Sequence, residues 1–253
     1  MELVDKLSNR QYIDGEWVES SNKNTRDIIN PYNQETIFTV AEGTKEDVER
    51  AILAARRSFE DGEWSLETSE VRGKKVRAVA DKIKKNREEL AKLETLDTGK
   101  TLEESYADMD DIHNVFMYFA GLADKDGGEM INSPIPNTES KIVKEPVGVV
   151  TQITPWNYPL LQASWKIAPA LATGCSLVMK PSEITPLTTI RVFELMEEVG
   201  FPKGTINLVL GAGSEVGDVM SGHEEVDLVS FTGGIETGKH IMKQAANHVT
   251  DVA

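Results

Sequence analysis

Residues 147–183 read as strand, loop, helix, strand and loop, and this order constrains the fold more than any other stretch. Residues 147–154 are apolar and β-branched, and 155–159 (PWNYP) interrupt them because each proline disfavours helix in the residue before it. Residues 160–172 carry apolar side chains at helical spacing, and 176–179 form a second apolar strand. Parallel strands joined by a helix bind ligands at the carboxyl ends of the strands.

The same alternation continues to the end of the chain. Glycine at position 174 is expected to end the first helix in the left-handed conformation. Further strands are expected at 206–210, 227–231 and within 248–253, with helices at 186–199 and 235–246. This pattern predicts an α/β fold: a parallel, Rossmann-like sheet with helices on both faces.

The residues before 147 favour hairpins and helices. Asp14-Gly15 predicts a hairpin over 11–19. Apolar periodicity predicts helices over 45–60, 69–95 and 101–123, the first beginning with the Thr44/Asp47 pattern of a capping box. We therefore assign 1–126 to the N-terminal part of the same domain and 147–253 to its Rossmann-like region.

Residues 127–146 differ in character from both neighbours. They carry Pro134, Pro136 and the alternation Lys141-Ile142-Val143-Lys144. This composition predicts an extended arm or hairpin. Two interpretations remain open: an arm that joins subunits, or a surface hairpin without a partner.

Composition excludes several classes of function. The formal net charge of -15 disfavours binding to nucleic acid and to anionic membrane surfaces. No apolar run approaches the length of a membrane span, and the start of the chain, MELVDKLSNR, lacks the apolar core of a signal peptide. A single cysteine, Cys175, suits a reducing compartment. These features predict a cytoplasmic protein.

Two glycine-rich turns raise the question of phosphate binding. Residues 211–217 read G-x-G-x-x-x-G between a strand and a helix; Gly213 and Gly217 suit either a phosphate contact or a turn that needs glycine for steric reasons. Residues 233–240 imitate a P-loop, but His240 stands where Ser or Thr would hold magnesium. A second Gly-Lys-Thr, at 99–101, lacks the first glycine of that motif because Glu94 takes its place.

Several ordered motifs carry a family resemblance. PWNYP at 155–159, KPSE at 180–183, NP at 30–31, LDTGK at 96–100 and FTGG at 231–234 together resemble the aldehyde dehydrogenase superfamily, and most closely its betaine-aldehyde-oxidising members. The resemblance implies NAD-dependent oxidation of betaine aldehyde, or a related amino aldehyde, to the carboxylate. In such enzymes a thiolate attacks the aldehyde, hydride passes to NAD and water releases the acid.

The family chain is about twice this long, which implies that these residues are its cofactor-binding half. The reactive cysteine and the glutamate base of the family would lie beyond Ala253, so the catalytic domain is absent and the chain alone is expected to be inactive. Cys175, at the start of an apolar strand, is expected to be a small core residue.

The resemblance also implies an NAD site. Glu183 would accept hydrogen bonds from the adenosine ribose and repel a 2′-phosphate, with Lys180 beside it, whereas the plainer interpretation is an exposed ion pair. Gly234 replaces a serine that many members have, which removes a hydroxyl donor. The predicted cofactor residues are Ile153, Thr154, Pro155, Trp156, Lys180, Pro181, Ser182, Glu183, Gly213, Gly217, Phe231, Thr232, Gly233, Gly234 and Thr237.

Catalytic and cation-binding residues follow from the same resemblance. The Asn157 amide would donate to the oxyanion; a turn asparagine bonded to its own backbone is the alternative. Lys166 would relay a proton, or pair with a carboxylate as an ordinary lysine. Asp97, with the main-chain carbonyls of Ile28 and Ile184, resembles a site for K⁺ or Na⁺, although Asp97 also suits a turn cap.

The predicted partners are a small aldehyde and further copies of the chain, as a dimer or tetramer. Two other functions stay open at this point. One is a non-catalytic nucleotide-binding or oligomerisation module. The other is a P-loop-like nucleoside triphosphatase.

Overall fold

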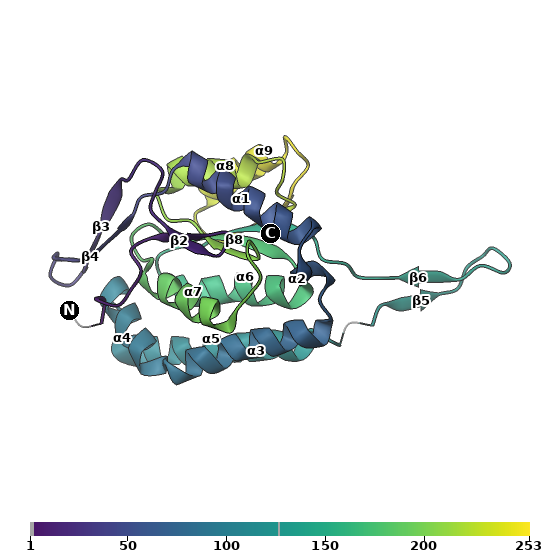
Figure 1. The fold of residues 1–253 in the computed structure, drawn as a ribbon, viewed down its shortest axis with the longest axis horizontal. Helices are drawn as coiled ribbons and strands as arrows, with labels where there is room; N and C mark the ends of the chain where they lie inside the picture. The colour runs from purple at the N-terminus through teal and green to yellow at the C-terminus, as the bar shows by residue number, and fades with distance from the viewer. Residues whose placement is uncertain (1–2, 126) are drawn as a thin grey trace.

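A seven-stranded sheet forms the centre of the fold in the computed structural model, which describes residues 3–125 and 127–253 (Figure 1). The strand order is β11-β10-β7-β8-β9-β1-β2, and the first five of these strands are parallel. The parallel strands are β7 (Val149–Ile153), β8 (Ser176–Lys180), β9 (Ile206–Leu208), β10 (Leu228–Phe231) and β11 (Asp251–Val252). The predicted α/β class and parallel sheet are confirmed.

The predicted N-terminal hairpin extends this sheet. Strands β1 (Gln11–Ile13) and β2 (Glu16–Val18) are antiparallel, and Tyr12 lies opposite Leu208 of β9. Asp14 and Gly15 both have positive φ, 54° and 80°, as the tight hairpin turn requires. Local sequence patterns predict the hairpin but not its pairing with β9, because the two paired segments are separated by almost the whole chain.

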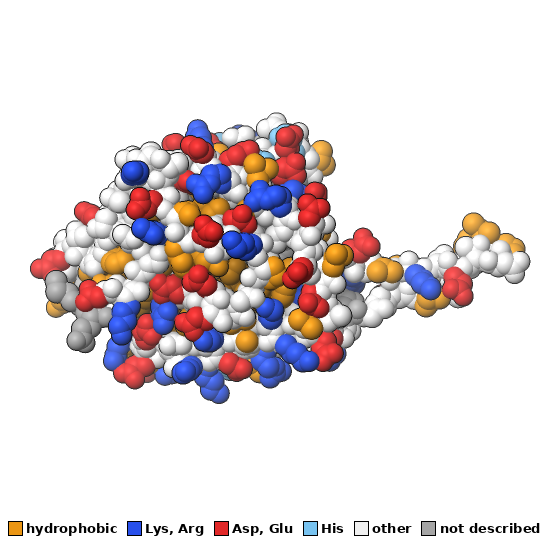
Figure 2. Space-filling view, viewed as in Figure 1, with side chains coloured by type: hydrophobic (Ala, Val, Ile, Leu, Met, Phe, Trp, Pro, Cys, Tyr) orange, Lys and Arg blue, Asp and Glu red, His pale blue; other side chains and the backbone are white. Residues whose placement is uncertain are grey.

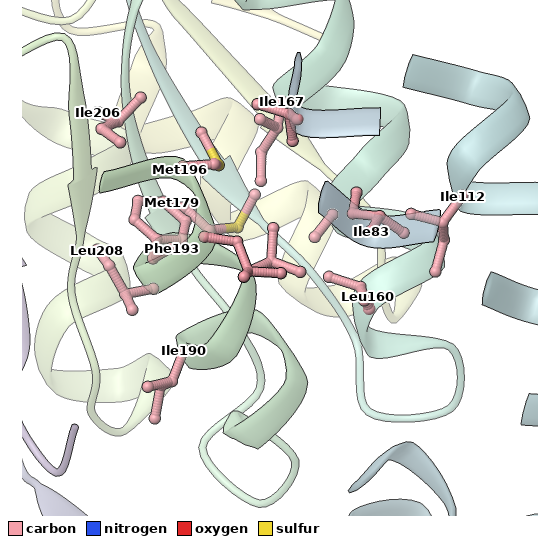
Figure 3. Packing of buried hydrophobic residues seen from close by; sticks show 14 of the residues in the cluster. Ile83, Ile112, Leu160, Ile167, Met179, Ile190, Phe193, Met196, Ile206 and Leu208 are labelled. Atoms are coloured by element: carbon pink, nitrogen blue, oxygen red, sulfur yellow. The ribbon is translucent and has the colours of Figure 1, made fainter. Parts of the chain in front are cut away.

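Helices cover both faces of the sheet (Figure 1). Helices α1 (Lys45–Glu60), α8 (Asp218–Gly222) and α9 (Ile235–Ala245) lie on one face, where their apolar side chains pack with Val149 and Val178. Helices α6 (Pro159–Thr173) and α7 (Leu187–Val199) cover the other, where Phe193 and Met196 pack with Met179 and Leu208 (Figure 3). Successive side chains of each strand point to opposite faces of the sheet, so the strands contribute to a hydrophobic core on each face.

A second helical layer packs against α6 and α7, and it corrects one prediction. The single helix expected over 69–95 is wrong: the structure has α3 (Ser69–Lys85) and α4 (Arg87–Thr98). Asn86 separates them with φ −102° and ψ 18°, and its side-chain amide donates to the Lys82 carbonyl at 2.8 Å. This local hydrogen bond competes with continued helix. Helix α5 (Leu102–Leu122) completes the layer. A short helix, α2 (Glu63–Leu66), lies between α1 and α3 in the chain.

Two hairpins lie outside the central sheet. One pairs β3 (Thr25–Ile29) with β4 (Thr36–Ala41). The other pairs β5 (Glu129–Ile131) with β6 (Ser140–Ile142) and projects from the body as the predicted arm (Figures 1 and 2). Residues 1–2 of the predicted first region, and its last residue 126, lie outside the described residues. Among the described helices, none has the length and apolarity needed to span a membrane.

Candidate functional site

The carboxyl ends of three parallel strands meet at one edge of the sheet. Ile153 ends β7 and lies opposite both Lys180 of β8 and Phe231 of β10. The pairing continues one residue further, because the Thr154 N–H donates to the Lys180 carbonyl at 3.2 Å and the Thr232 N–H donates to the Ile153 carbonyl at 3.1 Å. The loops that carry the predicted site residues therefore leave the sheet together.

Lys180 and Glu183 form an ion pair at this edge, with Nζ 3.1 Å from Oε2. Lys180 is only 2% exposed and also donates to the Pro181 carbonyl, so the exposed-pair interpretation is wrong. Burial lowers the pKa of Lys180. Burial alone would raise the pKa of the half-buried Glu183, but Lys180, the backbone N–H of Glu183 itself and, least, the backbone N–H of Gly213 outweigh it and lower that pKa. Glu183 is therefore an ionised acceptor.

Glu183 faces a cavity of about 610 Å³. Five residues predicted to bind the cofactor line it, together with five that were not predicted: Ile153, Glu183, Gly213, Gly217 and Thr237, then Ser214, Asp218, Glu236, His240 and Ile241. The structure thus brings the ends of β7, β8 and α9 to one space, large enough for a nucleotide portion of a dinucleotide.

The glycine-rich turn opens into this cavity as a five-residue π-helix, Gly213–Gly217. A Cβ added at Gly213 or Gly217 would meet nothing within 4 Å, so neither glycine is required by packing. Gly211 is different, because its φ of +133° is a conformation that other residues rarely adopt. The steric explanation therefore fits Gly211, and the open space beside Gly213 and Gly217 suits a close ligand.

The start of α9 supplies backbone donors to the same cavity. Gly234 is the N-cap, without a side-chain cap, and a Cβ there would meet nothing within 4 Å. By contrast, a Cβ at Gly233 would lie 2.5 Å from the Phe231 ring. The first N–H groups of a helix have no intrahelical acceptor and suit a phosphate.

Neither lysine of the P-loop-like segments is placed to hold a phosphate. Lys239 pairs with Glu236 at 2.8 Å and does not line the cavity. Lys100 is buried and donates to Asp108 at 2.6 Å. The geometry gives the triphosphatase alternative no support.

The remaining predicted cofactor residues build the loops at the edge. Thr154, Pro181 and Ser182 are buried, whereas Trp156 is exposed and Pro155 lies between these extremes. The hydroxyl of Thr185, in the loop between β8 and α7, donates to the Trp156 carbonyl at 3.4 Å. The loops after β7 and β8 are therefore joined, and Asn157 and Glu183 lie at the same end of the sheet.

Asn157 is exposed on the loop before α6, and within the described part of the chain its side chain makes no hydrogen bond. The self-bonded turn asparagine is therefore not what this structure shows, and the amide is available to a ligand. Lys166, on α6, donates to the Ser230 hydroxyl at 3.1 Å rather than to a carboxylate. Burial lowers the pKa of Lys166 to about 8, which suits a group that gains and loses a proton near neutral pH.

Asp97 caps a helix start, and its role in cation binding stays a prediction. Its Oδ2 accepts the Leu187 N–H at 2.8 Å, so it does cap a helix start. Its Oδ1 is buried and has no hydrogen-bond partner among residues 3–125 and 127–253, so this oxygen is available to a cation. Ile28 is buried in β3 and Ile184 is exposed just before α7. Oxygen ligands of this kind fit a hard monovalent cation.

Two groups of residues escaped the sequence analysis. His240 bonds Asp218 at 2.7 Å across the cavity wall, and its spacing of three from Thr237 on one helix was the available signal. A second cavity, about 480 Å³, lies between α5 and α6 and is lined by Asp111, Asn114, Val115, Tyr118, Phe119, Leu161 and Trp165. Its aromatic residues come from two helices, so no single motif reveals it.

The fold and this edge of strands define an α/β protein with a Rossmann-like parallel sheet, and comparison assigns the family. Residues 17–253 match the aldehyde dehydrogenase family, and the chain belongs to it. It is 64% identical over 247 residues to betaine aldehyde dehydrogenase of Bacillus subtilis (strain 168), covering 98% of this chain and 50% of that protein. It is 46% identical over 255 residues to aminoaldehyde dehydrogenase 1 of Pisum sativum, a peroxisomal protein, with the same coverage.

A solved structure extends the comparison to the fold. Betaine aldehyde dehydrogenase from Staphylococcus aureus, in complex with NAD⁺, is 90% identical with a TM-score of 0.99, and the match covers 100% of this chain and 50% of that one. The predicted resemblance is therefore confirmed: this chain is a homologue of betaine aldehyde dehydrogenases. It spans about half the length of the relatives it matches.

Proposed function

We propose that the chain is the cofactor-binding half of an NAD-dependent aldehyde dehydrogenase that oxidises betaine aldehyde, or a related amino aldehyde, to the carboxylate. The observation that carries this proposal is an ionised Glu183 facing an open cavity at the carboxyl ends of β7, β8 and β10. The 90% identical protein in complex with NAD⁺ supports the choice of cofactor.

Each part of the cavity suits one part of NAD. Glu183 would accept hydrogen bonds from the adenosine ribose hydroxyls, and N–H groups of the Gly213–Gly217 turn and of the start of α9 would face the pyrophosphate. Glu236 and Asp218 add negative charge to the wall, which disfavours the 2′-phosphate of NADP. When bound, NAD supplies the hydride acceptor.

Two side chains outside the cavity lining, on the loop after β7 and on α6, suit the chemistry of aldehyde oxidation. The exposed Asn157 amide would donate a hydrogen bond to the oxygen on which negative charge develops, an interaction commonly worth about 3 kcal/mol in the transition state. Lys166, with its pKa of about 8 and its contact with Ser230, would hold or move a proton at Nζ. Both roles need a nucleophile that this chain does not place nearby.

The aromatic cavity between α5 and α6 supports a cationic aldehyde. Trp165 is 52% exposed and Tyr118 is 63% exposed, so both rings have uncovered surface, and Asp111 adds negative charge. Aromatic faces attract quaternary ammonium groups such as that of betaine aldehyde. We therefore assign the amine end of the substrate to this cavity.

The only cysteine of the chain lies at the wrong edge for catalysis. Cys175 is buried and precedes β8, whereas Lys180 ends that strand at the cofactor edge. We therefore propose that these 253 residues alone bind cofactor without turnover, as a cofactor-binding module would. The cytoplasmic location inferred from composition stays a prediction.

A turnover assay tests the function. The 253-residue chain, with NAD⁺ and betaine aldehyde, should form no NADH detectable by absorbance. A chimera that continues after Ala253 with the remaining half of the Bacillus subtilis relative should oxidise betaine aldehyde. In that chimera Asn157→Ala should lower kcat about 100-fold. Turnover by the 253-residue chain, or an inactive but folded chimera, would contradict the proposal.

Self-association is proposed for the arm. Met130, Ile131, Ile135, Ile142 and Val143 are all exposed on or beside β5 and β6, an apolar surface suited to a second copy of the chain. Sedimentation of the chain should show a dimer or tetramer that dissociates when Ile131 and Ile142 are both replaced by Lys. A monomer before substitution would exclude this role.

A further inference from the structure

The turn that precedes the cofactor cavity is supported by residues from the other end of the chain. The Gln11 side-chain oxygen accepts the Leu210 N–H at 3.1 Å, and the Gly43 N–H donates to the Leu210 carbonyl at 3.0 Å. The fit is close, because a Cβ at Gly43 would lie 2.2 Å from that carbonyl oxygen. The segment after β4 therefore forms the back wall of the turn.

Glu42 extends this wall to the next peptide. Its Oε1 accepts the Ala212 N–H at 3.0 Å, one residue before Gly213. Arg26 of β3 binds the same carboxylate in a bidentate manner, with Nε 2.5 Å from Oε2 and Nη2 2.7 Å from Oε1. The pair is partly buried, since the Arg26 side chain is 33% and the Glu42 side chain 20% exposed, and its two parallel hydrogen bonds fix the orientation of the carboxylate.

This turn and Glu183 meet at the cofactor cavity, because Gly213 and Glu183 both line it. The backbone N–H of Gly213 stabilises the charged form of Glu183 and so helps to lower its pKa. Arg26 is close enough to Glu183 for their charges to interact, and Glu42 likewise interacts with Lys180. The charges of Arg26 and Glu42 thus act on the Lys180–Glu183 pair.

We propose that Glu42, fixed by Arg26, is a positioning residue for cofactor binding: it holds the Gly211–Ala212 peptide, and so the start of the Gly213–Gly217 turn that lines the cavity beside Glu183 and keeps this carboxylate directed toward the adenosine ribose. The inference rests on the proposed NAD site. Nothing in the motifs of the chain points to Arg26, which lies in a hairpin outside the central sheet, or to Glu42, which directly follows that hairpin. Outer groups that orient a binding residue commonly change affinity about tenfold or more.

Calorimetric titration of the 253-residue chain tests this role with two ligands. The first is NAD⁺; the second is its analogue without the 2′-hydroxyl on the adenosine ribose. The unsubstituted chain should prefer NAD⁺ by about tenfold. Glu42→Ala should weaken NAD⁺ by about tenfold and reduce the preference to about twofold, because the misplaced carboxylate no longer distinguishes the hydroxyl.

Matched variants separate positioning from general stability. Asp27→Asn removes a carboxylate that accepts from Thr39 in the same hairpin and should leave both affinities within about twofold. The exchanged pair Arg26→Glu with Glu42→Arg restores opposite charges between the two positions but presents a donor to the Ala212 N–H. It should not restore NAD⁺ affinity. Glu42→Gln, which keeps an acceptor oxygen, should lose about threefold.

Each outcome decides the inference. Equal weakening of both ligands by Glu42→Ala, or recovery with the exchanged pair, would reduce Glu42 to a structural ion pair. Unchanged affinities would exclude any role. If the unsubstituted chain fails to bind NAD⁺, the proposed function fails first. If Glu42→Ala does not fold, the same comparison is made with Glu42→Gln, for which an unchanged preference would overturn the inference.

Discussion

Two regions of the molecule hold carboxylates, and they shift the pKa values of these carboxylates in opposite directions. At the cofactor edge Glu183 is half-buried, beside Lys180 and the Gly213 N–H, and its pKa lies below the usual range. In the buried acidic cluster, which we define as Glu94, Asp97, Lys100 and Asp108 between α4, α5 and α7, burial raises the pKa of every carboxylate. The pKa of Glu94 reaches about 7.

The difference shows what a binding carboxylate needs. Lys100 lies 2.6 Å from Asp108 but 3.7 Å from Glu94, so one cation serves two carboxylates that are almost fully buried. At the edge, one cation and a backbone donor serve one carboxylate that still faces open space. The first arrangement favours protonated or cation-bound carboxylates within the fold, and the second keeps a charged acceptor ready for ribose hydroxyls.

The largest expected effect is at the edge. Glu183→Ala should weaken NAD⁺ binding about 100-fold, because two hydrogen bonds to a charged acceptor are lost. Calorimetry of the 253-residue chain measures this. Glu215→Ala, on the same turn but outside the cavity lining, is the control and should bind normally. An unchanged affinity for NAD⁺ in Glu183→Ala would remove the contrast between the two regions.

The buried acidic cluster predicts a pH-dependent stability. Folding raises the pKa of Glu94 from 4.5 to about 7. Burying the ionised carboxylate therefore lowers the free energy of unfolding, and this penalty is absent below pH 4.5 and complete above pH 7. Glu94→Gln should therefore gain stability relative to the unsubstituted chain by about 3 kcal/mol between pH 4.5 and 7.5. Urea unfolding across this range measures the gain. Glu88→Gln, at an exposed site paired with Lys92, should show no such trend.

A monovalent cation should act on the buried region and not on the edge. With Asp97 Oδ1 unpartnered, 100 mM K⁺ in place of choline should raise the unfolding free energy by about 1 kcal/mol. Asp97→Asn should abolish the difference between the two salts. If K⁺ and choline give the same melting temperature before substitution, the predicted cation site with Ile28 and Ile184 is wrong.

The smallest effect is expected from Gly234→Ser. A Cβ at this N-cap meets nothing within 4 Å, and serine adds a hydroxyl donor beside the cavity. NAD⁺ should bind about threefold more tightly, a gain of one weak hydrogen bond. Gly233→Ser is the contrasting variant, because its Cβ would collide with Phe231 and should weaken binding. Weaker binding in Gly234→Ser would contradict the open space seen there.

Much of the fold was predictable because local signals agreed with it. Asp14-Gly15, the Thr44/Asp47 capping box and the glycine at 174 each formed the turn, cap or helix end expected of them. The order of strands and helices after Val147 placed Glu183 and Asn157 at one edge. That inference needs only the rule that parallel strands end together.

The remaining features depend on contacts between distant segments. A side-chain hydrogen bond at Asn86 divides a helix that periodicity joins. The hairpin of β1 and β2 finds β9 about 190 residues later, as the Asp14 N–H to Asn207 contact (separation 193) illustrates. The opposite pKa shifts of Glu94 and Glu183 follow from burial and partners, which residue type does not reveal.

The central claim is that the open carboxyl edge is a dinucleotide site selective for NAD. Calorimetric titration of the 253-residue chain with NAD⁺, NADP⁺ and MgATP tests it most directly. We predict saturable 1:1 binding of NAD⁺ and at least about tenfold weaker binding of NADP⁺. Preference for MgATP, or no heat of binding with any of the three ligands from a folded chain, would contradict it.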